Sequence, residues 1–481
     1  MNQSPRWARI LLLVIILGYL AAGVCYARFT PAWQAPDEPA HYNYVRYLVE
    51  KGRLPVLQIG DYPHHYLEEI KARRFPPEMS IDPLRYEFHQ PPLYYALASV
   101  VYRLTGGSLL ALRLFSLLLG TGLLLVAWAL VRAVFSEQPG LALGTTAFVA
   151  FLPMHLAVAS AVNNDALAEL LLAASVLGLV RYLQARETSP LRAIGLGLLL
   201  GLGLVTKISV LIALPLALVA LLIAPRSRRE RLRDGLLIFG LAGLVLLPWL
   251  VRNHLTYGGL DLWGLARHNQ IVVGQPRTAE WLAQMGWGGL LQAFAQTTFQ
   301  SFWGQFGWMG VLLDSRLYLL LKLLSGLVAL GILLYLVRKL QPTPSQWRLP
   351  LLLTLWLGFT FLSYLWYNLQ FVQHQGRYLF PALIPLGLVF ALGLAEALAR
   401  PRAGLMAGLC LSGALLLMAR GLLLGEPDKW AIAFTAGAGI FFILRHFLPR
   451  VWDGWVHSLP YVGLFALDFI CLFGFIVPGL S

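Results

Sequence analysis

Long apolar segments separated by short polar links run through the whole chain. Most of these segments approach or exceed the roughly 20 residues that cross a bilayer as a helix. Thirteen of them lie approximately at residues 10–24, 109–131, 141–161, 166–183, 194–205, 208–224, 236–251, 317–337, 349–369, 378–398, 405–424, 431–444 and 461–480. Because lipid offers no partner for backbone polar groups, this pattern predicts an all-α fold, a polytopic transmembrane helical bundle of about 13 spans.

The composition supports a membrane chain and excludes a soluble enzyme. Hydrophobic residues make up 58% of the chain and charged residues only 12%, about half the charged share of a typical soluble domain. The three cysteines, Cys25, Cys410 and Cys471, all lie inside apolar segments. They are too scattered for a paired-cysteine zinc site or a disulfide framework.

The basic residues indicate an orientation. The chain has 37 lysines and arginines against 23 acids, a net charge of +14. Cations gather in alternate short links, such as 226–233 and 400–402, whereas the opposite links 163–165 and 426–429 contain few. By the positive-inside rule, this asymmetry predicts a multi-pass protein of the cell membrane with a cytoplasmic N-terminus. No arginine-rich tail stands apart from the membrane, so nucleic acid is not an expected partner.

Two links, 28–107 and 252–316, are far longer than a connection requires, and both fall outside in this topology. We expect short interfacial helices in them, because Pro39 and Gly52 can bound one helix and the proline pair before Leu93 can start another. The second loop is rich in tryptophan and glutamine. This composition is typical of an aromatic belt at the membrane interface and equally of sugar recognition.

Polar side chains crowd one short stretch of the first outer loop. At helical spacing Asp37 lies near His41. Glu38 lies near Tyr42 in the same way, and Arg46 follows one turn further. Adjacent carboxylates beside an imidazole and a guanidinium are typical of a base with groups that tune it, as transfer of a sugar to a hydroxyl requires. The alternative is structural, with Asp37 as a helix cap and Glu38 as a first-turn acid.

Three sequence islands resemble a known group of enzymes. They are Asp37-Glu38, the element His-Gln-Pro-Pro-Leu-Tyr-Tyr at 89–95, and the run Gln-Gly-Arg-Tyr-Leu-Phe-Pro-Ala at 375–382. The chain is similar, from about 33 to about 394, to the GT-C membrane glycosyltransferases, in particular the family 39, RgtA/B/C/D-like and DUF2142-like proteins. This resemblance divides the chain into a GT-C-like catalytic region, 1–424, and a C-terminal transmembrane extension, 425–481.

The resemblance implies an integral membrane glycosyltransferase. Its donor would be a sugar linked to a polyprenyl phosphate, its acceptor a hydroxyl of a glycan, lipid or protein, and its active site would lie at the outer membrane face. Asp37 matches the position of the family's loop acid, which implies that it is the base; Glu38 is the alternative base, and His41 would tune it. His89 matches the histidine of the family's His-Pro-Pro-like element, although Gln90 interrupts the element here. The alternative for His89 is loop packing.

A second acid, Asp165, lies at the outer turn before the fourth segment, and Glu169 lies one turn deeper on the same face. Related enzymes often place an acid at this turn that binds a metal or orients substrate, so a divalent cation held with Asp37 or Glu38 is a candidate cofactor. The alternative is that Asp165 caps its own helix. A carboxylate at membrane depth costs about 2.5 to 3.5 kcal/mol, so Glu169 should face a partner or a cavity.

Three cations are predicted at the outer boundary, where they suit a lipid phosphate: Lys207, Arg252 and Arg377. For Lys207 and Arg252 the alternative is snorkelling to the interface. His374 and Tyr378 flank Arg377 and complete the predicted substrate-binding set with Tyr42, Arg46, His89 and Asp165.

Two rival functions remain open for this sequence. A transporter or flippase for a lipid-linked saccharide would also need outer cations and intramembrane acids, but we find no internal repeat of the kind that such folds carry. A noncatalytic assembly subunit with the same fold is the third hypothesis. Asp468, inside the last apolar segment, is expected to be paired within the bundle rather than catalytic.

Overall fold

The computed structural model describes residues 5–185, 187, 189–338 and 347–481, and its elements are almost all helical. In chain order they are α1 Arg6–Phe29, α2 Glu38–Lys51, α3 His64–Ala72, η1 Tyr86–His89, α4 Leu93–Thr105, α5 Leu109–Val134, α6 Pro139–Ala150, α7 Pro153–Ala159, α8 Asp165–Gln184, α9 Pro190–Leu204, η2 Ile208–Ile212, α10 Ala213–Ile223, α11 Arg228–Tyr257, α12 Leu265–Ile271, α13 Thr278–Trp303, β1 Gln305–Phe306, β2 Val311–Leu312, α14 Ser315–Arg338, α15 Arg348–Asn368, η3 Gly376–Ala382, α16 Leu383–Ala397, η4 Arg400–Arg402, α17 Ala403–Leu424, α18 Lys429–Phe447, η5 Arg450–Trp452, α19 Asp453–Cys471, the π-helical η6 Leu472–Ile476 and α20 Val477–Leu480. The two short strands form one antiparallel pair.

The long helices confirm the predicted all-helical, multi-pass membrane fold. In the part of the chain that the structure describes, ten helices are long and apolar enough to cross a membrane, or up to 11 with the bent pair α6–α7. Two shorter apolar helices, Pro190–Leu204 and Ile208–Ile223, fall where two further segments are predicted. The count of thirteen spans stays a prediction, because those two helices are short for a bilayer.

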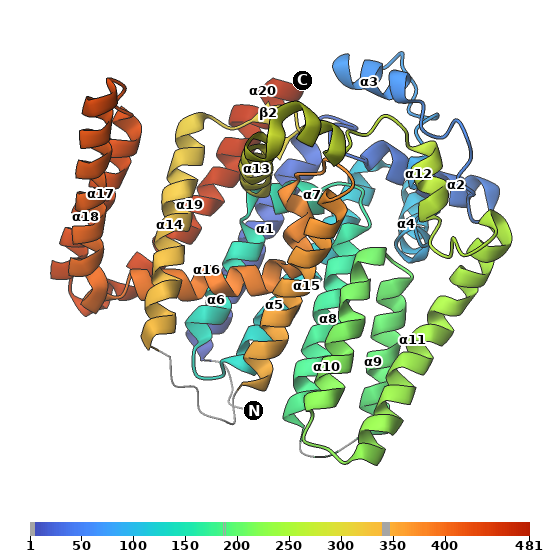
Figure 1. Ribbon diagram of the computed structural model, residues 1–481. Helices are drawn as coiled ribbons and strands as arrows, with labels where there is room; N and C mark the ends of the chain where they lie inside the picture. The colour runs from blue at the N-terminus through green and yellow to red at the C-terminus, as the bar shows by residue number, and fades with distance from the viewer. Residues whose placement is uncertain (1–4, 186, 188, 339–346) are drawn as a thin grey trace.

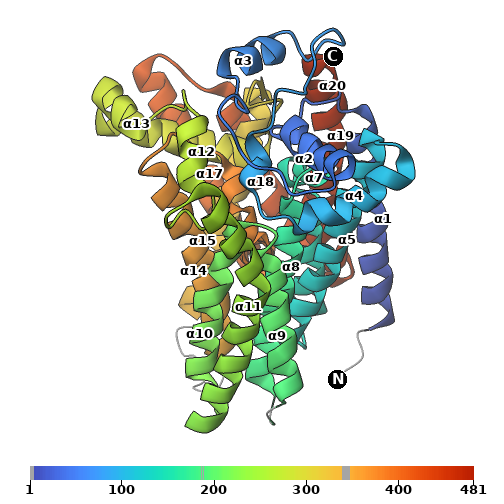
Figure 2. The ribbon, with the colours of Figure 1, turned by 90° about the vertical axis from the view of Figure 1, so that its right-hand side faces the viewer.

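The elements of the two long links gather at one end of the bundle (Figure 1). This end, which carries α2, α3, α4, α12 and α13, is called the loop end below. Figure 2, turned by 90°, shows the same grouping, with the N-terminus at the opposite end and the C-terminus at the loop end. Short helices in both long links were predicted, and two of their boundaries agree: α4 begins at Leu93, and Gly52 ends α2 with a left-handed φ of 63°.

The central helix α6 is broken off from α7 by a bend of 64°. Pro153, the first residue of α7, causes the break, because proline lacks a backbone N–H and disfavours helical backbone at the residue before it. Residues 141–150 of α6 are buried on every side, which places this helix in the core among α1, α5 and α16. The bend carries the chain to the loop end, where residues 160–164 connect α7 to α8.

Asp468 in α19 departs from expectation. Its side chain is fully buried, and neither carboxylate oxygen has a hydrogen-bond partner within the described ranges. The hydroxyl of Tyr26 donates instead to the Asp468 backbone carbonyl, at 2.8 Å. The predicted pairing of this acid in the bundle is therefore wrong, since the nearby donor is taken by the main chain.

Candidate active site

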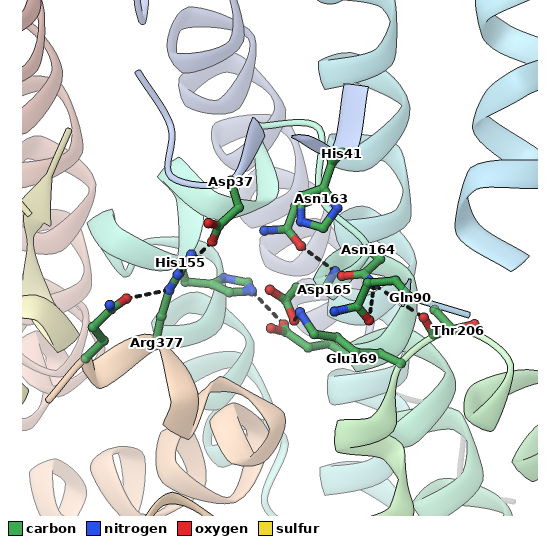
Figure 3. A network of polar contacts seen from close by, with 12 residues as sticks. Asp37, His41, Gln90, His155, Asn163, Asn164, Asp165, Glu169, Thr206 and Arg377 are labelled. Atoms are coloured by element: carbon green, nitrogen blue, oxygen red, sulfur yellow. Dashed lines mark hydrogen bonds and ion pairs between the residues drawn. The ribbon is translucent and has the colours of Figure 1, made fainter. Parts of the chain in front are cut away.

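The Asp37 side chain turns away from the helix that it precedes. Asp37 occupies the N-cap position of α2 with a left-handed φ of 68°, and its carboxylate makes no cap hydrogen bond. Its Oδ2 accepts from Nη2 of Arg377 at 2.9 Å, and its Oδ1 accepts from the Tyr86 hydroxyl at 3.1 Å. The alternative of Asp37 as a helix cap is therefore wrong, and the carboxylate turns toward Arg377 (Figure 3).

Arg377 reaches Asp37 from 340 residues away in the sequence. It lies in η3, where its Nε also donates to Oε1 of Gln375 at 2.8 Å. The preceding Gly376 allows η3 to approach α13, because a Cβ at this position would lie 2.4 Å from Cα of Phe302. The Gly376 N–H donates to Oγ of Ser301 at 2.7 Å and holds this approach in place.

A second ion pair joins Asp165 at the start of α8 to Lys207, which lies between α9 and η2. Lys207 Nζ is 2.6 Å from Oδ1 of Asp165. Asn164, not Asp165, occupies the N-cap position of α8, so the predicted alternative of Asp165 as the helix cap is wrong. Asp165 and Arg377 lie close enough for their charges to interact, and both belong with Asp37 to the polar network in Figure 3.

The pKa of Asp37 is set by opposing effects. Burial raises the pKa, but the positive charge of Arg377 and the hydrogen bonds from Arg377 and Tyr86 outweigh it and hold the pKa below the ordinary value. Burial lowers the pKa of His41, whose Nδ1 hydrogen-bonds with the Tyr95 hydroxyl at 2.7 Å. At neutral pH the site therefore contains an ionised Asp37 and a His41 that favours its neutral form.

Glu38 sits in a different environment from its neighbour. It is fully buried, and its two oxygens accept from Nε and Nη2 of Arg113 at 2.7 and 2.6 Å. The backbone N–H groups of Val162 and Trp33 donate to the same carboxylate, each at 3.2 Å. This geometry argues against the predicted role of Glu38 as an alternative base, because every oxygen is engaged and no substrate can reach it. The carboxylate instead ties α2 to α5 and to the α7–α8 link.

Glu169 has the partner that its depth requires. Its Oε2 lies 3.0 Å from Nε2 of His155 in α7, and Nδ1 of the same ring lies 2.9 Å from the Val149 carbonyl oxygen. A carbonyl only accepts, so Nδ1 carries a proton, and a second proton must lie between Nε2 and Glu169. The sequence analysis missed His155 and Arg113; each is a polar residue inside an apolar segment, which is the signal that singles out such positions.

Two predicted site residues of α2 face elsewhere. The Tyr42 hydroxyl donates to the Gly107 carbonyl at 2.8 Å. Arg46 pairs with Asp82 at 2.6 Å on the exposed rim of the first loop. Both contacts lie within the first long link, and the substrate-binding roles of Tyr42 and Arg46 stay predictions.

His89 agrees with the loop-packing alternative. Its Nδ1 lies 3.0 Å from the Tyr86 carbonyl oxygen, and its ring centroid lies 4.4 Å from that of His268 in α12. Burial and His268 hold the pKa of His89 well below its usual value. The residue joins the two long links of the loop end, and its predicted contact with substrate is not supported by this position.

The last three predicted site residues, Arg252, His374 and Tyr378, lie in different surroundings. Arg252 donates to the Pro55 carbonyl and lies over the Trp249 ring, so its side chain is committed to the edge of α11 rather than to a phosphate. His374 is buried between Trp281 and Phe294, and its substrate contact stays a prediction. Tyr378 stays at the site, because the Arg377 guanidinium lies 5.7 Å from its ring.

A narrow cavity is lined by Pro36 and Arg377, the sequence neighbour and the ion-pair partner of Asp37. It has an empty volume of about 450 Å³ that includes its open mouth, and Thr30, Gln34, Asn163 and Arg377 form its polar wall. Its apolar wall comes from α7, the β1–β2 turn and the C-terminal helices, with the residues Met154, Ala157, Val158, Phe306, Ile476 and Leu480. A site with this lining suits a ligand that has one anionic and one greasy end.

A hard divalent cation needs several oxygen ligands close together. Across residues 5–185, 187, 189–338 and 347–481, no group of three or more His, Cys, Asp or Glu side chains could hold a metal ion. Asp37 and Asp165, the two acids predicted for a divalent cation, each have a cation as partner in this structure.

The fold defines a known class of membrane protein. This chain matches ArnT from Cupriavidus metallidurans bound to undecaprenyl phosphate with a TM-score of 0.53 and 15% identity, over 98% of this chain and 76% of ArnT. Apo ArnT from the same organism matches with a TM-score of 0.54 and 14% identity, over 97% of this chain and 76% of ArnT. AglB from Archaeoglobus fulgidus, in complex with an inhibitory peptide and a dolichol-phosphate, gives 0.51 and 13%, over 96% of this chain and 56% of AglB. The chain has the GT-C fold, as predicted.

A family comparison points to the same class. Residues 89–251, about a third of the chain, match the sequence model of the dolichyl-phosphate-mannose-protein mannosyltransferase family. No curated protein matches the chain. The family match and the fold together confirm the predicted resemblance to GT-C membrane glycosyltransferases.

Proposed function

We propose that this protein is a membrane glycosyltransferase that moves a sugar from a polyprenyl-phosphate carrier to an acceptor hydroxyl. The observation that carries the proposal is the meeting of two carboxylate–cation pairs from four separate segments at one end of the bundle. All four side chains are partly open, with 13 to 25% exposure. A base and a phosphate site are thus accessible together, as sugar transfer requires.

In the proposed reaction, Asp37 removes the proton of the acceptor hydroxyl, whose oxygen bonds to the anomeric carbon. The bond from that carbon to the phosphate oxygen breaks, and the oxygen keeps the electron pair. Arg377 and Lys207 stabilise the charge that grows on the phosphate. Inversion at the anomeric carbon is the expectation that comes with the fold. Asp165 positions Lys207, and Glu38 positions the start of α2 through Arg113.

The carrier is proposed by likeness. ArnT is seen with undecaprenyl phosphate and AglB with a dolichol-phosphate. The cavity beside Asp37, with its arginine and its apolar wall, supports a carrier of the same chemistry for this chain. A divalent cation is not assigned a role.

The test is sugar transfer by the purified full-length protein in detergent, with a panel of undecaprenyl-phosphate-linked sugars and an envelope fraction as acceptor. Product formation that disappears in Asp37→Asn and persists in Asp82→Asn supports the proposal. A transporter for lipid-linked saccharides, the rival function, would form no product in detergent but would move the lipid in sealed vesicles. That result would replace the proposed function.

We also propose that the N-terminus is cytoplasmic and that the loop end faces outward. The two termini lie at opposite ends of the bundle (Figure 1), so tags on each should differ in accessibility. In intact cells, a C-terminal tag should be reached by an external protease and an N-terminal tag should be protected. The reverse pattern would invert the topology and place the site inside.

A further inference from the structure

The base proposed above is engaged before any substrate arrives. Arg377 binds Asp37 at 2.9 Å, and this pair helps to hold the Asp37 pKa below its ordinary value. A carboxylate in such a pair is a poor base, because taking up a proton would leave the guanidinium without its counter-charge. Transfer therefore requires something that separates Arg377 from Asp37.

The neighbouring cavity is lined by a buried side chain whose hydrogen-bond donor has no partner. Gln34 lines it beside Arg377, and its side chain is 3% exposed. Its Nε2 has no hydrogen-bond partner within the described ranges. A buried amide without a partner costs free energy, which a ligand oxygen can recover. Phosphate oxygens only accept, so they suit both the Gln34 amide and the Arg377 guanidinium.

We propose that the phosphate of an isoprenoid carrier binds in this cavity between Gln34 and Arg377, and that it draws Arg377 away from Asp37. The base is then released only when the donor is present. This inference rests on the proposed function for the identity of the base, and it adds a phosphate ligand, Gln34, and an order of events. The donor must bind before the acceptor hydroxyl can be deprotonated.

The charge changes of the reaction follow the same path. Before transfer, one negative charge lies on Asp37 and one on the phosphodiester of the donor. Afterwards Asp37 holds the acceptor proton and is neutral, while the released isoprenoid phosphate has gained the second charge. The negative charge thus moves from Asp37 to the phosphate, and Arg377 is positioned to follow it. Charge stays balanced without any further reactant.

The other groups around Asp37 do not replace Arg377. They are His41 from α2, Tyr62 from the first loop, Tyr86 from η1, Tyr367 from α15 and Tyr378 from η3. Among them only Tyr86 donates a hydrogen bond to the carboxylate. Once Arg377 has left, burial becomes the dominant effect on Asp37, and its affinity for a proton rises.

The experiment measures the protonation of Asp37 directly. A hydrophobic carbodiimide labels protonated carboxyls, so full-length protein in detergent is labelled across a pH series with and without undecaprenyl phosphate, and Asp37 labelling is followed by mass spectrometry. We expect the midpoint of Asp37 labelling to rise by at least one pH unit with the lipid. Asp82 is the internal control, because it pairs with Arg46 at 2.6 Å away from the cavity and should not respond.

Two variants sharpen the result. Arg377→Gln should show the raised midpoint without lipid and no further change with it. Gln34→Leu keeps the Arg377–Asp37 pair and should need at least tenfold more undecaprenyl phosphate for the same shift, a readout that remains if Arg377→Gln fails to fold. An unchanged Asp37 midpoint at saturating lipid, failure of the lipid to bind, or an equal shift at Asp82 would overturn the inference.

The outcome is separable from that of the proposed function, since no sugar is transferred in this assay. If the lipid shifts the midpoint of Asp37 labelling but the protein forms no product, the phosphate site is supported and the proposed glycosyltransferase function is wrong. If product forms but the midpoint of Asp37 labelling does not shift, the enzyme function is supported and the movement of Arg377 from Asp37 to the phosphate is wrong.

Discussion

Asp37 and Glu38 are neighbours in the sequence, and each pairs with an arginine, yet their surroundings differ. Asp37 is 25% exposed and accepts from one Arg377 nitrogen and one tyrosine. Glu38 is fully buried and accepts from two Arg113 nitrogens and two backbone N–H groups. A carboxylate that is accessible and has few hydrogen-bond donors can exchange partners. A buried carboxylate with donors on both oxygens can only stabilise the structure around it. This difference supports the proposed role of Asp37 in the reaction and a structural role for Glu38.

The largest effect should separate the two acids by activity. Asp37→Asn removes the base, and we expect the rate of sugar transfer to fall by roughly 10²- to 10⁴-fold, the range for a lost general base. The melting temperature should fall only by the contribution of the Arg377–Asp37 pair, since the side chain is replaced by one of the same size. Transfer assays and melting curves on the same preparation check this, and a fully active variant would return the role of base to another group.

The next effect should appear in stability. Arg113→Ala leaves the Glu38 carboxylate buried without its counter-charge, which costs about 3 to 5 kcal/mol in measured cases. We expect a strong loss of thermal stability in detergent, with no specific change in donor KM for the protein that remains folded. The double variant Glu38→Gln with Arg113→Met should recover part of the loss. Wild-type melting of the single variant would contradict the assembly role.

Lys207 tests whether the second ion pair belongs to the reaction. Lys207→Ala removes a charge that we place on the donor phosphate, and we expect donor KM to rise about tenfold, equivalent to about 1.4 kcal/mol. Lys207→Arg keeps the charge and should retain most of the affinity. The measurement is the dependence of initial rate on donor concentration. Equal KM values for Lys207→Ala and the wild type would reduce Lys207 to an interface cation.

A smaller, pH-dependent effect follows from the Asp37 pKa. Since the folded-state pKa lies below that of the unfolded chain, near 3.9, the pair contributes stability fully above that value and loses it as pH falls through the lowered one. The difference in melting temperature between wild type and Asp37→Asn should stay constant from about pH 7 to pH 5 and shrink below about pH 4. A difference that grows on acidification would contradict the depressed pKa.

The smallest effect is expected at the rim of the first loop. Arg46→Gln breaks an exposed ion pair with Asp82, and such pairs contribute about 0 to 1 kcal/mol. We expect sugar transfer and melting temperature to stay near wild-type values. A clear loss of donor affinity would reinstate the substrate contact first predicted for Arg46.

The sequence by itself determined the class of structure and the end of the bundle at which each polar residue lies. Both follow from local information, because a run of apolar residues forms a spanning helix whatever its neighbours, and the order of the runs assigns each link to one side. Asp37, Asp165, Lys207 and Arg377 were placed on one side in this way. Glu169 was predicted to need a partner because of its depth alone, and His155 lies 3.0 Å from it.

Only the tertiary structure decided which cation meets which acid. The sequence predicted both Arg377 and Arg252 at the outer boundary, but the close approach of Gly376 to Phe302 brings Arg377 to Asp37, while Arg252 binds the Pro55 carbonyl. Glu38 likewise stayed open as the alternative base until its burial and its pairing with Arg113 set it apart from Asp37. Ion pairing falls off over a few ångströms, and separations of that size between residues hundreds of positions apart depend on helix packing that no local pattern encodes.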